Sequence, residues 1–198
     1  MGGTTAAAGV GTAERVAAAA VSVVARDGFD VLSVRTVARE AGLSGGAVQY
    51  HYATRAELLL AAFRHTVTSI TGRLAGIDLA GPLPMVLGRL GREALPLDAR
   101  RHRECVVWVA LSAAAAAHPQ LAAEHARALH ALTGSLVEAI TTARAAGRIR
   151  EAVDPAKAAA VLVAVLDGLT LHGITGSPDA DTLTATLDAA IDLVLLGG

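Results

Sequence analysis

The stretch from Ser33 to Tyr52 constrains the fold more than any other part of the chain. Ser33 is a typical N-cap, apolar residues follow it at helical spacing, and Gly42 is placed to end that helix in a left-handed conformation. Ser44 then offers a second N-cap directly after the turn. Two short helices joined by a tight glycine turn form a helix-turn-helix, whose second helix lies in the DNA major groove.

The second helix of this motif has an inner and an outer set of side chains. Val48 and Tyr52 lie on one side, while Gln49, Tyr50 and His51 are left facing outward. A glutamine can contact adenine bidentately, and the other two side chains can reach phosphates or base edges. The start of the first helix and the residue before the next one add phosphate candidates. The predicted DNA-binding residues are Arg35, Thr36, Ser44, Gly45, Gly46, Ala47, Gln49, Tyr50, His51 and Arg55.

Gly45 and Gly46 need their own explanation, because each costs about 0.5–1 kcal/mol in a helix relative to alanine. Either the helix backbone approaches the DNA closely there, or the first turn of the helix is loose until DNA binds. We expect the second. Amide exchange at Ala47 and Val48 should then be fast in the free protein and slow on DNA.

A multi-residue pattern surrounds these positions. It consists of Phe29, Leu32-Ser33-Val34-Arg35, Ala38, Ala41-Gly42-Leu43-Ser44, Gly46, Tyr50-His51-Tyr52, Arg55 and Glu57-Leu58. With this pattern, residues 12–63 resemble the N-terminal domain of the TetR family of one-component bacterial repressors. The sequence departs from the family at Gln49, where an aromatic residue is usual, and at Gly45, where a long or polar residue is usual.

Composition and the positions of helix caps and breakers predict an all-α protein of about nine helices. Hydrophobic residues make up 53% of the chain and aromatic residues only 3%, so the core is built mainly from Ala, Val and Leu. Alanine is the best helix former, and no alternating strand pattern competes with the helical one. Glycines, prolines and N-caps place the helices at about 12–27, 34–41, 44–51, 54–71, 84–95, 99–117, 120–146, 155–172 and after Ser177-Pro178.

The same signals divide the chain into three parts. Residues 1–11 have no periodicity and are expected to form a flexible arm. Residues 12–54 are the predicted three-helix helix-turn-helix domain for DNA binding. Residues 55–198 are the predicted helical domain for effector binding and dimerisation.

Scattered positions in the second half carry a further resemblance. They are Trp108, His118-Pro119, Gly147-Arg148-Ile149, Val153-Asp154-Pro155 and Leu166-Asp167-Gly168-Leu169. Here the chain resembles the ligand-binding half of the TetR family, particularly the subgroup related to the choline-responsive betaine regulator. The resemblance implies a homodimer formed through the last two helices.

The residues of the last two helices independently favour a buried position. On the last helix, one apolar stripe is formed by Leu183, Leu187, Ala190, Ile191 and Val194. The helix before it is apolar on most sides over residues 158–166. A helix that is apolar all round is expected to pack against both its own core and a partner. A four-helix dimer interface is the natural result.

An effector site is predicted in the second half. Cys105, Trp108 and Ser112 fall on one helical face that could line a pocket, while plain core packing is the alternative for each residue. Small-molecule sites are largely apolar with a few polar groups that fix orientation. The candidate effector-binding residues are Met85, Trp108, Ser112, Thr133 and His172.

Charge refines the predicted partners. The net charge is −1, and residues 1–60 hold five arginines against five acidic residues. Non-specific attraction to DNA should therefore be modest, with a shallow salt dependence. Arg100, Arg101 and Arg103, with His102, form either an anion site for the effector or an ordinary solvated helix start.

Several other classes of protein are disfavoured. The single Cys105 allows no internal disulfide and fits a reducing cytoplasm, which is the expected location. The longest apolar runs, 105–117 and 156–166, are shorter than the roughly 20 residues of a membrane span. No signal peptide is evident at the N-terminus. No cofactor is implied, and no metal set is completed by the histidines of the second half, His118, His125 and His130.

We therefore expect a dimeric, ligand-responsive repressor that a small molecule releases from a palindromic double-stranded DNA operator. Activation in place of repression stays open. One rival is a small helical hydrolase, because Gly42 to Gly46 also fits a G-x-S-x-G nucleophile elbow around Ser44. That motif needs a strand before the serine, and a helical pattern stands there. A second rival is a helical interaction module that binds no DNA.

Overall fold

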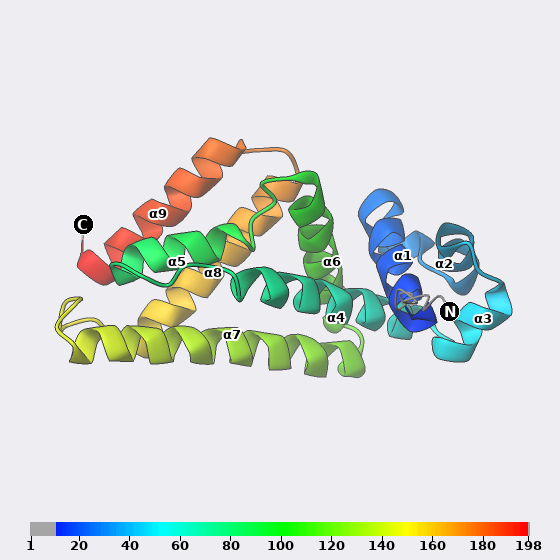
Figure 1. Ribbon diagram of the computed structural model, residues 1–198, viewed down its shortest axis with the longest axis horizontal. Coiled ribbons are helices and arrows are strands. Elements are labelled where there is room, and N and C mark those ends of the chain that lie inside the picture. Colours follow the sequence, from blue (N-terminus) through cyan, green and yellow to red (C-terminus); the bar gives the residue numbers. More distant parts are fainter. Residues whose placement is uncertain (1–10, 198) are drawn as a thin grey trace, which may run out of the picture.

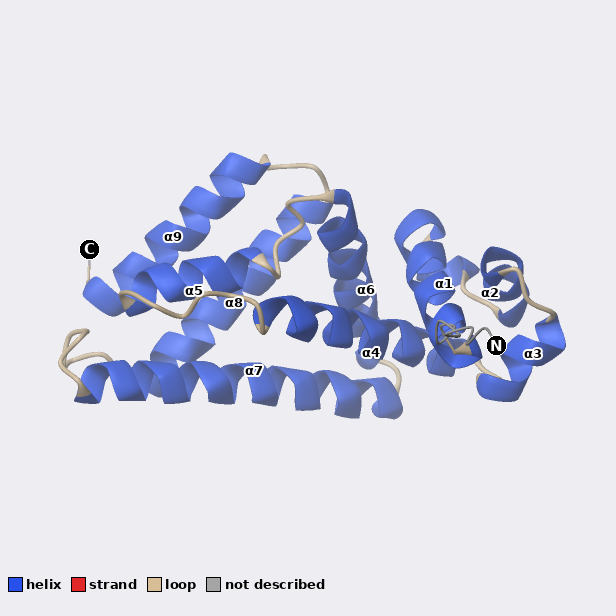
Figure 2. Ribbon diagram, viewed as in Figure 1, coloured by secondary structure: helices blue, strands red, loops and turns tan. Residues whose placement is uncertain are grey.

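The chain is all-α, as its sequence predicts. The computed structural model describes residues 11–197, and in that range it contains nine α-helices, one 3-10 helix and no strand (Figure 2). The elements are α1 (Thr12–Asp27), η1 (Phe29–Val31), α2 (Val34–Ala41), α3 (Gly45–His51), α4 (Arg55–Leu74), α5 (Leu83–Arg92), α6 (Ala99–Ala115), α7 (Pro119–Ala145), α8 (Pro155–Ile174) and α9 (Ala180–Leu196). The arm expected over residues 1–11 lies outside the described residues, apart from Gly11.

The molecule is elongated, with α1 to α3 at one end and α5, α9 and the C-terminal end at the other (Figure 1). Helix α4 extends from the first group toward the second, and α7 lies along one side. The recognition-type helix α3 is therefore far from the last helix. Any communication between the two ends has to pass through the helices between them.

Local sequence explains where the N-terminal helices begin. Ser33, Ser44 and Thr54 are confirmed as N-caps, because each side-chain oxygen accepts a backbone N–H of the helix that follows. Thr54 and Glu57 form the expected capping box, since the carboxylate of Glu57 also accepts the N–H of Thr54 at 3.0 Å. These caps satisfy backbone donors that would otherwise have no partner at the helix starts.

The N-terminal core extends past the expected domain boundary at residues 54 and 55. Val16 and Val23 of α1 are fully buried together with Leu58 and Leu59 of α4. The same cluster includes Leu111 of α6 and residues of α2 and α7. The first half of α4 thus packs in one core with α1 and α2, on the far side of the boundary expected at residues 54 and 55.

A second core holds α5, α7, α8 and α9 together. The apolar stripe of the last helix is largely turned into it, with Leu183, Leu187 and Ile191 at most 3% exposed. Gly91 and Gly173 permit close packing here. A Cβ at Gly91 would lie 2.8 Å from the Leu187 side chain, and one at Gly173 would lie 2.5 Å from the Pro96 ring. The stripe predicted to contribute to the dimer interface therefore packs mainly inside its own subunit.

Several helix boundaries differ from their predictions. Helix α4 continues to Leu74 rather than ending near residue 71. Helix α5 ends at Arg92 rather than near residue 95, because Glu93 and the residues after it form turns before Pro96. The prediction that Ser177-Pro178 starts the last helix was wrong. Asp179 is the N-cap of α9, and its carboxylate accepts the N–H of Thr182 at 2.9 Å. An ionised side chain at this position also interacts favourably with the helix dipole.

Helix α8 is long and apolar enough to cross a membrane by length and composition, and 33% of its most apolar window is buried inside the structure. It packs against α6, α7 and α9. Core helices pass the same test, so this property is weak support for a membrane span.

Candidate DNA-binding surface and effector cavity

The turn between α2 and α3 is fixed by its backbone. Gly42 has φ 62° and ψ 39°, a left-handed conformation that a side chain disfavours, and the N–H of Leu43 returns to the carbonyl of Ala38 at 2.9 Å. Ser44 then caps α3 through its Oγ, which accepts the N–H of Ala47 at 3.2 Å. These contacts set the angle at which α3 leaves the turn.

One side of helix α3 packs against the N-terminal core, and the other side is exposed to solvent. Val48 is fully buried in the N-terminal core, whereas Gln49, Tyr50 and His51 are exposed. Tyr50 is 85% exposed, and its ring meets the ring of His51 edge-to-face with centroids 5.1 Å apart. Figure 1 shows α3 at the outer end of the molecule, opposite α5 and α9.

Gly45 and Gly46 are not required by the packing of this chain. Neither has a positive φ, and a Cβ added at either residue would meet no atom within 4 Å. Both lie exposed in the first turn of α3. The packing of residues 11–197 therefore does not explain their small size.

The arginines around the motif have different roles. Arg35 and Arg39 are exposed and make no side-chain hydrogen bond or ion pair within residues 11–197. They are four residues apart, so they share one face of α2. Arg39 was missed by the sequence prediction, although its spacing from Arg35 was a usable sign.

Two predicted phosphate contacts also make hydrogen bonds within the protein. Arg55 donates from Nε to the carbonyl of Leu32 at 3.1 Å, and its guanidinium lies over the Phe29 ring, 5.4 Å from the centroid. Thr36 is only 9% exposed, and its hydroxyl donates to the carbonyl of Val31 at 2.9 Å. Both residues hold the helix-turn-helix in shape.

A cavity of about 460 Å³ lies among α4 to α9. Its lining is mostly Leu, Val, Ile and Ala side chains, and one wall is the second half of α4, with Val67, Ile70, Thr71 and Leu74. Small-molecule sites typically have volumes of about 300–1,000 Å³ and this apolar character. The cavity is therefore a candidate effector site, and α4 connects it directly to the DNA-binding end.

Asp167 of α8 and Trp108 of α6 meet at the cavity lining. The indole Nε1 of Trp108 donates to Oδ1 of Asp167 at 3.1 Å. Burial raises the pKa of Asp167, while the Trp108 hydrogen bond and the charge of His125 oppose that rise. The Trp108 ring also packs beside Phe63, with ring centroids 5.6 Å apart. This pair joins a carboxylate to an aromatic surface in a mostly apolar lining.

Cys105 contributes a neutral group to the lining. Its thiol donates to the carbonyl of Ala94 at 3.3 Å, and the hydroxyl of Thr170 reaches the same oxygen at 3.3 Å. Burial raises the pKa of Cys105 to about 12. The residue therefore remains a thiol at neutral pH, and a thiol is a weak nucleophile.

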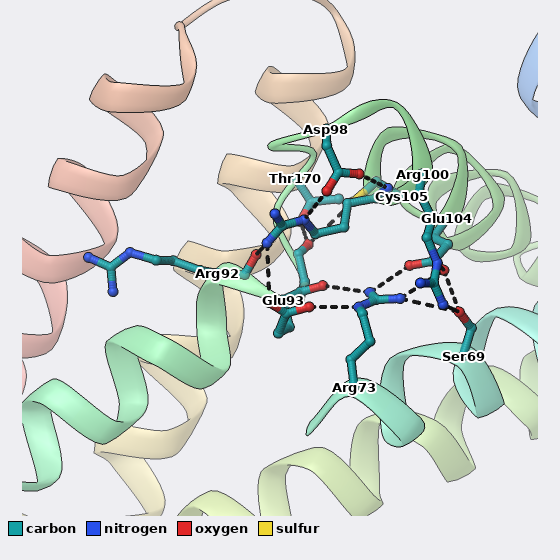
Figure 3. Close-up of polar contacts among 11 residues, drawn as sticks. Ser69, Arg73, Arg92, Glu93, Asp98, Arg100, Glu104, Cys105 and Thr170 are labelled. Atoms are coloured by element: carbon teal, nitrogen blue, oxygen red, sulfur yellow. Dashed lines mark hydrogen bonds and ion pairs between the residues drawn. The ribbon is translucent and has the colours of Figure 1, made fainter. Parts of the chain in front are cut away.

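A partly buried ionic network borders the cavity (Figure 3). Arg73 of α4 lies between two carboxylates, with Nε 2.6 Å from Oε2 of Glu93 and Nη2 2.7 Å from Oε2 of Glu104. Ser69 donates to the other oxygen of Glu104 at 2.6 Å. Burial raises the pKa of Glu104, but the hydrogen bonds from Arg73 and Ser69 and the charge of Arg73 bring it below its ordinary value. The network ties α4 to α6 and to the turn after α5.

The arginine cluster at the start of α6 takes part in this network. Arg101 pairs with Glu93 at 3.2 Å, and Arg100 pairs with Glu104 at 3.3 Å. Neither arginine lines the cavity. These two side chains are engaged by carboxylates of the protein, which fits the interpretation of a helix start better than that of an anion site.

Of the five predicted effector contacts, only Trp108 lines the cavity. Met85 and His172 are exposed, and Thr133 is half-buried on α7 away from the lining. Ser112 faces α7, where its hydroxyl lies 2.9 Å from Nε2 of His125. The prediction missed Asp167, Glu93, Glu104 and Arg73. Asp167 had a sign in the sequence, because it is the only Asp, Glu, Lys or Arg in residues 158–174.

Two family models match the chain along most of its length. Residues 16–62 match the N-terminal domain described as bacterial regulatory proteins of the tetR family. Residues 86–196 match the BetI-type transcriptional repressor C-terminal domain. The chain belongs to the TetR family. As a TetR-family transcriptional regulator it binds DNA through the helix-turn-helix described above, and the predicted resemblance is confirmed in both halves.

Individual relatives agree with this assignment. A transcriptional regulator from Rhodococcus sp. Rha1 has a crystal structure that is 34% identical, with a TM-score of 0.83 over 93% of this chain and 96% of that one. The HTH-type transcriptional regulator PksA of Bacillus subtilis (strain 168) is 34% identical over 102 residues, so the match spans about half of either chain.

One further structure is similar in fold. A putative transcriptional regulator from Saccharomonospora viridis, solved in complex with choline, is 24% identical with a TM-score of 0.84 over 92% of this chain and 96% of that one. At this identity the likeness concerns the fold alone.

Membership of the TetR family removes the two rival functions. The family consists of transcriptional regulators, which are not enzymes, and they bind DNA. Ser44 follows a helix rather than a strand, and its hydroxyl caps α3. It therefore lacks the strand-to-helix turn of a hydrolase nucleophile.

Proposed function

We propose that this TetR-family regulator acts as a homodimeric repressor that leaves its operator when a small molecule occupies the cavity. Each subunit would place α3 in one major groove of a palindromic site, with half-sites about one helical turn apart. Gln49, Tyr50 and His51 would face the bases and sugar-phosphate edges, and Arg35 and Arg39 would face phosphates.

One observation carries the proposal: α4 takes part in both sites. Its first half is packed in the N-terminal core through Leu58 and Phe63, and its second half forms a cavity wall through Ile70 and Leu74. A ligand that moves the second half of α4 would therefore move the core on which α3 rests. Such a ligand must prefer one of the two positions of α4, because equal affinity for both would shift nothing.

The homodimer is supported by apolar side chains that the subunit itself leaves uncovered. Val161 and Leu171 of α8 are 47% and 48% exposed, and Leu193 and Leu196 of α9 are 64% and 49% exposed. Apolar side chains gathered on two adjoining helices are typical of an interface. Pairing these faces in two subunits would build the four-helix interface expected from the sequence.

The test begins with the DNA that the protein selects. Genomic fragments enriched by the purified protein should contain a palindrome, and fluorescence anisotropy should show tighter binding to it than to random competitor. Gln49→Ala should weaken operator binding by about 1–3 kcal/mol and relax the preference at one base pair.

The arginine contacts are tested through salt dependence. Arg35→Ala should weaken binding on all sequences and lower the slope of log K against log salt by about one. Arg148→Ala is the matched control, because Arg148 is exposed after α7 and makes no side-chain hydrogen bond or ion pair within residues 11–197. Equal affinity for all fragments would end the proposal.

A further inference from the structure

The charges that line the cavity have one sign. Among the described lining residues there are three carboxylates, Glu93, Glu104 and Asp167, and no lysine, arginine or histidine. Two of the three are neutralised from outside the cavity, because Arg73 binds both Glu93 and Glu104. The remaining carboxylate, that of Asp167, has no such partner.

Asp167 is held in place but not neutralised. Its Oδ1 accepts the indole N–H of Trp108, and no lysine, arginine or histidine nitrogen lies within 4 Å of the carboxylate among residues 11–197. Its other oxygen accepts no hydrogen bond from those residues. The charge of His125 acts on it from a distance, but the Nε2 of that ring is engaged with Ser112 at 2.9 Å. One hydrogen-bonding position of the carboxylate is thus open.

The surroundings of Asp167 make this open position favour a cationic ligand over an anionic one. Leu166 and Val163 of α8 and Leu132 of α7 belong to the same lining, and Asp167 itself is exposed to solvent. An anionic ligand in this cavity would face a carboxylate that has no ion-pair partner, and the apolar lining screens the repulsion between the two charges less than water does. A ligand cation would instead pair with Asp167 and could rest on the aromatic surface of Trp108.

We infer that the effector is a hydrophobic monocation, an amine or quaternary ammonium with a large apolar body, whose charge is bound by Asp167 beside Trp108. The inference rests on the effector role of the cavity proposed above. The volume of about 460 Å³ accommodates a body of many carbon atoms. A small ammonium ion such as choline would leave most of that apolar lining uncovered.

The experiment compares three probes that share one apolar chain and differ in charge. Decyltrimethylammonium, decanol and decanoate are titrated below their micelle concentrations into the DNA-free protein. Trp108 is the only tryptophan of the chain, so its fluorescence reports occupancy of this cavity directly. The cation should bind about ten-fold more tightly than decanol, as expected for one charge-assisted contact, and decanoate should bind more weakly than decanol. Choline should bind more weakly than decyltrimethylammonium.

Two variants separate the charge from the shape of the site. Asp167→Asn should remove the preference for the cation while decanol still binds within about two-fold of the unchanged protein, which also shows that the cavity is folded. Glu138→Gln makes the same change of charge at an exposed position of α7 outside the lining, and it should leave the preference intact.

The outcomes distinguish this inference from the proposed function. Equal affinity for the three probes, preference for decanoate, or a cation preference that survives in Asp167→Asn would overturn the inference, even if some other ligand released the operator. Asp167-dependent binding of the cation without any change in DNA affinity would support the ligand class and contradict the repressor mechanism.

Discussion

At the scale of single residues, Gly45 and Gly46 combine open surroundings with an ordinary helical backbone. Gly45→Ala and Gly46→Ala should each stabilise the free protein by about 0.5–1 kcal/mol, because alanine loses less backbone entropy in a helix. Urea unfolding measures this gain. Gly42→Ala is the control with the opposite sign, since the φ of 62° at that position is unfavourable for a side chain.

The same variants distinguish the two explanations for the glycines, a loose first turn of α3 and close approach of DNA. If the first turn of α3 is loose in the free protein, as we expect, alanine pre-orders it and operator affinity stays equal or rises. The amides of Ala47 and Val48, which donate to Ser44, should then become protected on DNA binding. Strong protection in both states, or a large loss of operator affinity in the alanine variants, would show that close approach of DNA explains the pair.

At the scale of elements, the junction of α4 with α6 depends on Glu104. Its carboxylate is 7% exposed and binds both Arg73 and Ser69. Glu104→Gln should lower the free energy of unfolding at neutral pH by about 1.5–3 kcal/mol, the range for hydrogen bonds to charged groups. It should also change the affinity for the effector or the operator, because the network fixes the cavity wall of α4.

The pH dependence of this contribution has a definite sign. The pKa of Glu104 is lower in the folded protein than its ordinary value of 4.5. Its stabilisation is therefore complete above that value and is lost as the pH falls through the lowered pKa. Unfolding experiments from neutral to acidic pH should show the gap between the unchanged protein and Glu104→Gln narrowing below about pH 4. Glu138→Gln is the control and should show no such narrowing. If the difference in unfolding free energy between the unchanged protein and Glu104→Gln stays constant with pH, the role of Glu104 is contradicted.

Local sequence predicted the elements well and the cavity poorly, for a physical reason. Caps and breakers such as Thr54, Gly42 and Pro119 act on their own helix, so they can be identified without the fold. The network of Arg73, Glu93 and Glu104 joins groups from separate elements, and no local pattern contains it. The residues that line the cavity could not be predicted for the same reason. Whether a helix face meets a cavity, the core or solvent depends on how neighbouring helices cross it.

At the scale of the whole molecule, the dimer can be tested by charge on α9. Leu193→Glu should give monomers at micromolar concentration in analytical ultracentrifugation and lose operator binding, because a buried unpaired carboxylate opposes association. Leu79→Glu is a matched control, since Leu79 lies in the loop before α5 and is also 64% exposed, as is Leu193. A Leu193→Glu protein that still forms dimers would place the interface elsewhere.

The small number of free arginines near α3 affects how the regulator partitions between its operator and the rest of the genomic DNA. Arg15, Arg26 and Arg55 are engaged by carbonyls or carboxylates of the subunit, which leaves few cations to neutralise phosphates. Bulk genomic DNA should then sequester little of the protein, because that competition is driven almost entirely by phosphate neutralisation. A small number of copies would then suffice to occupy the operator, and under the proposed function a modest ligand-driven drop in affinity would empty it.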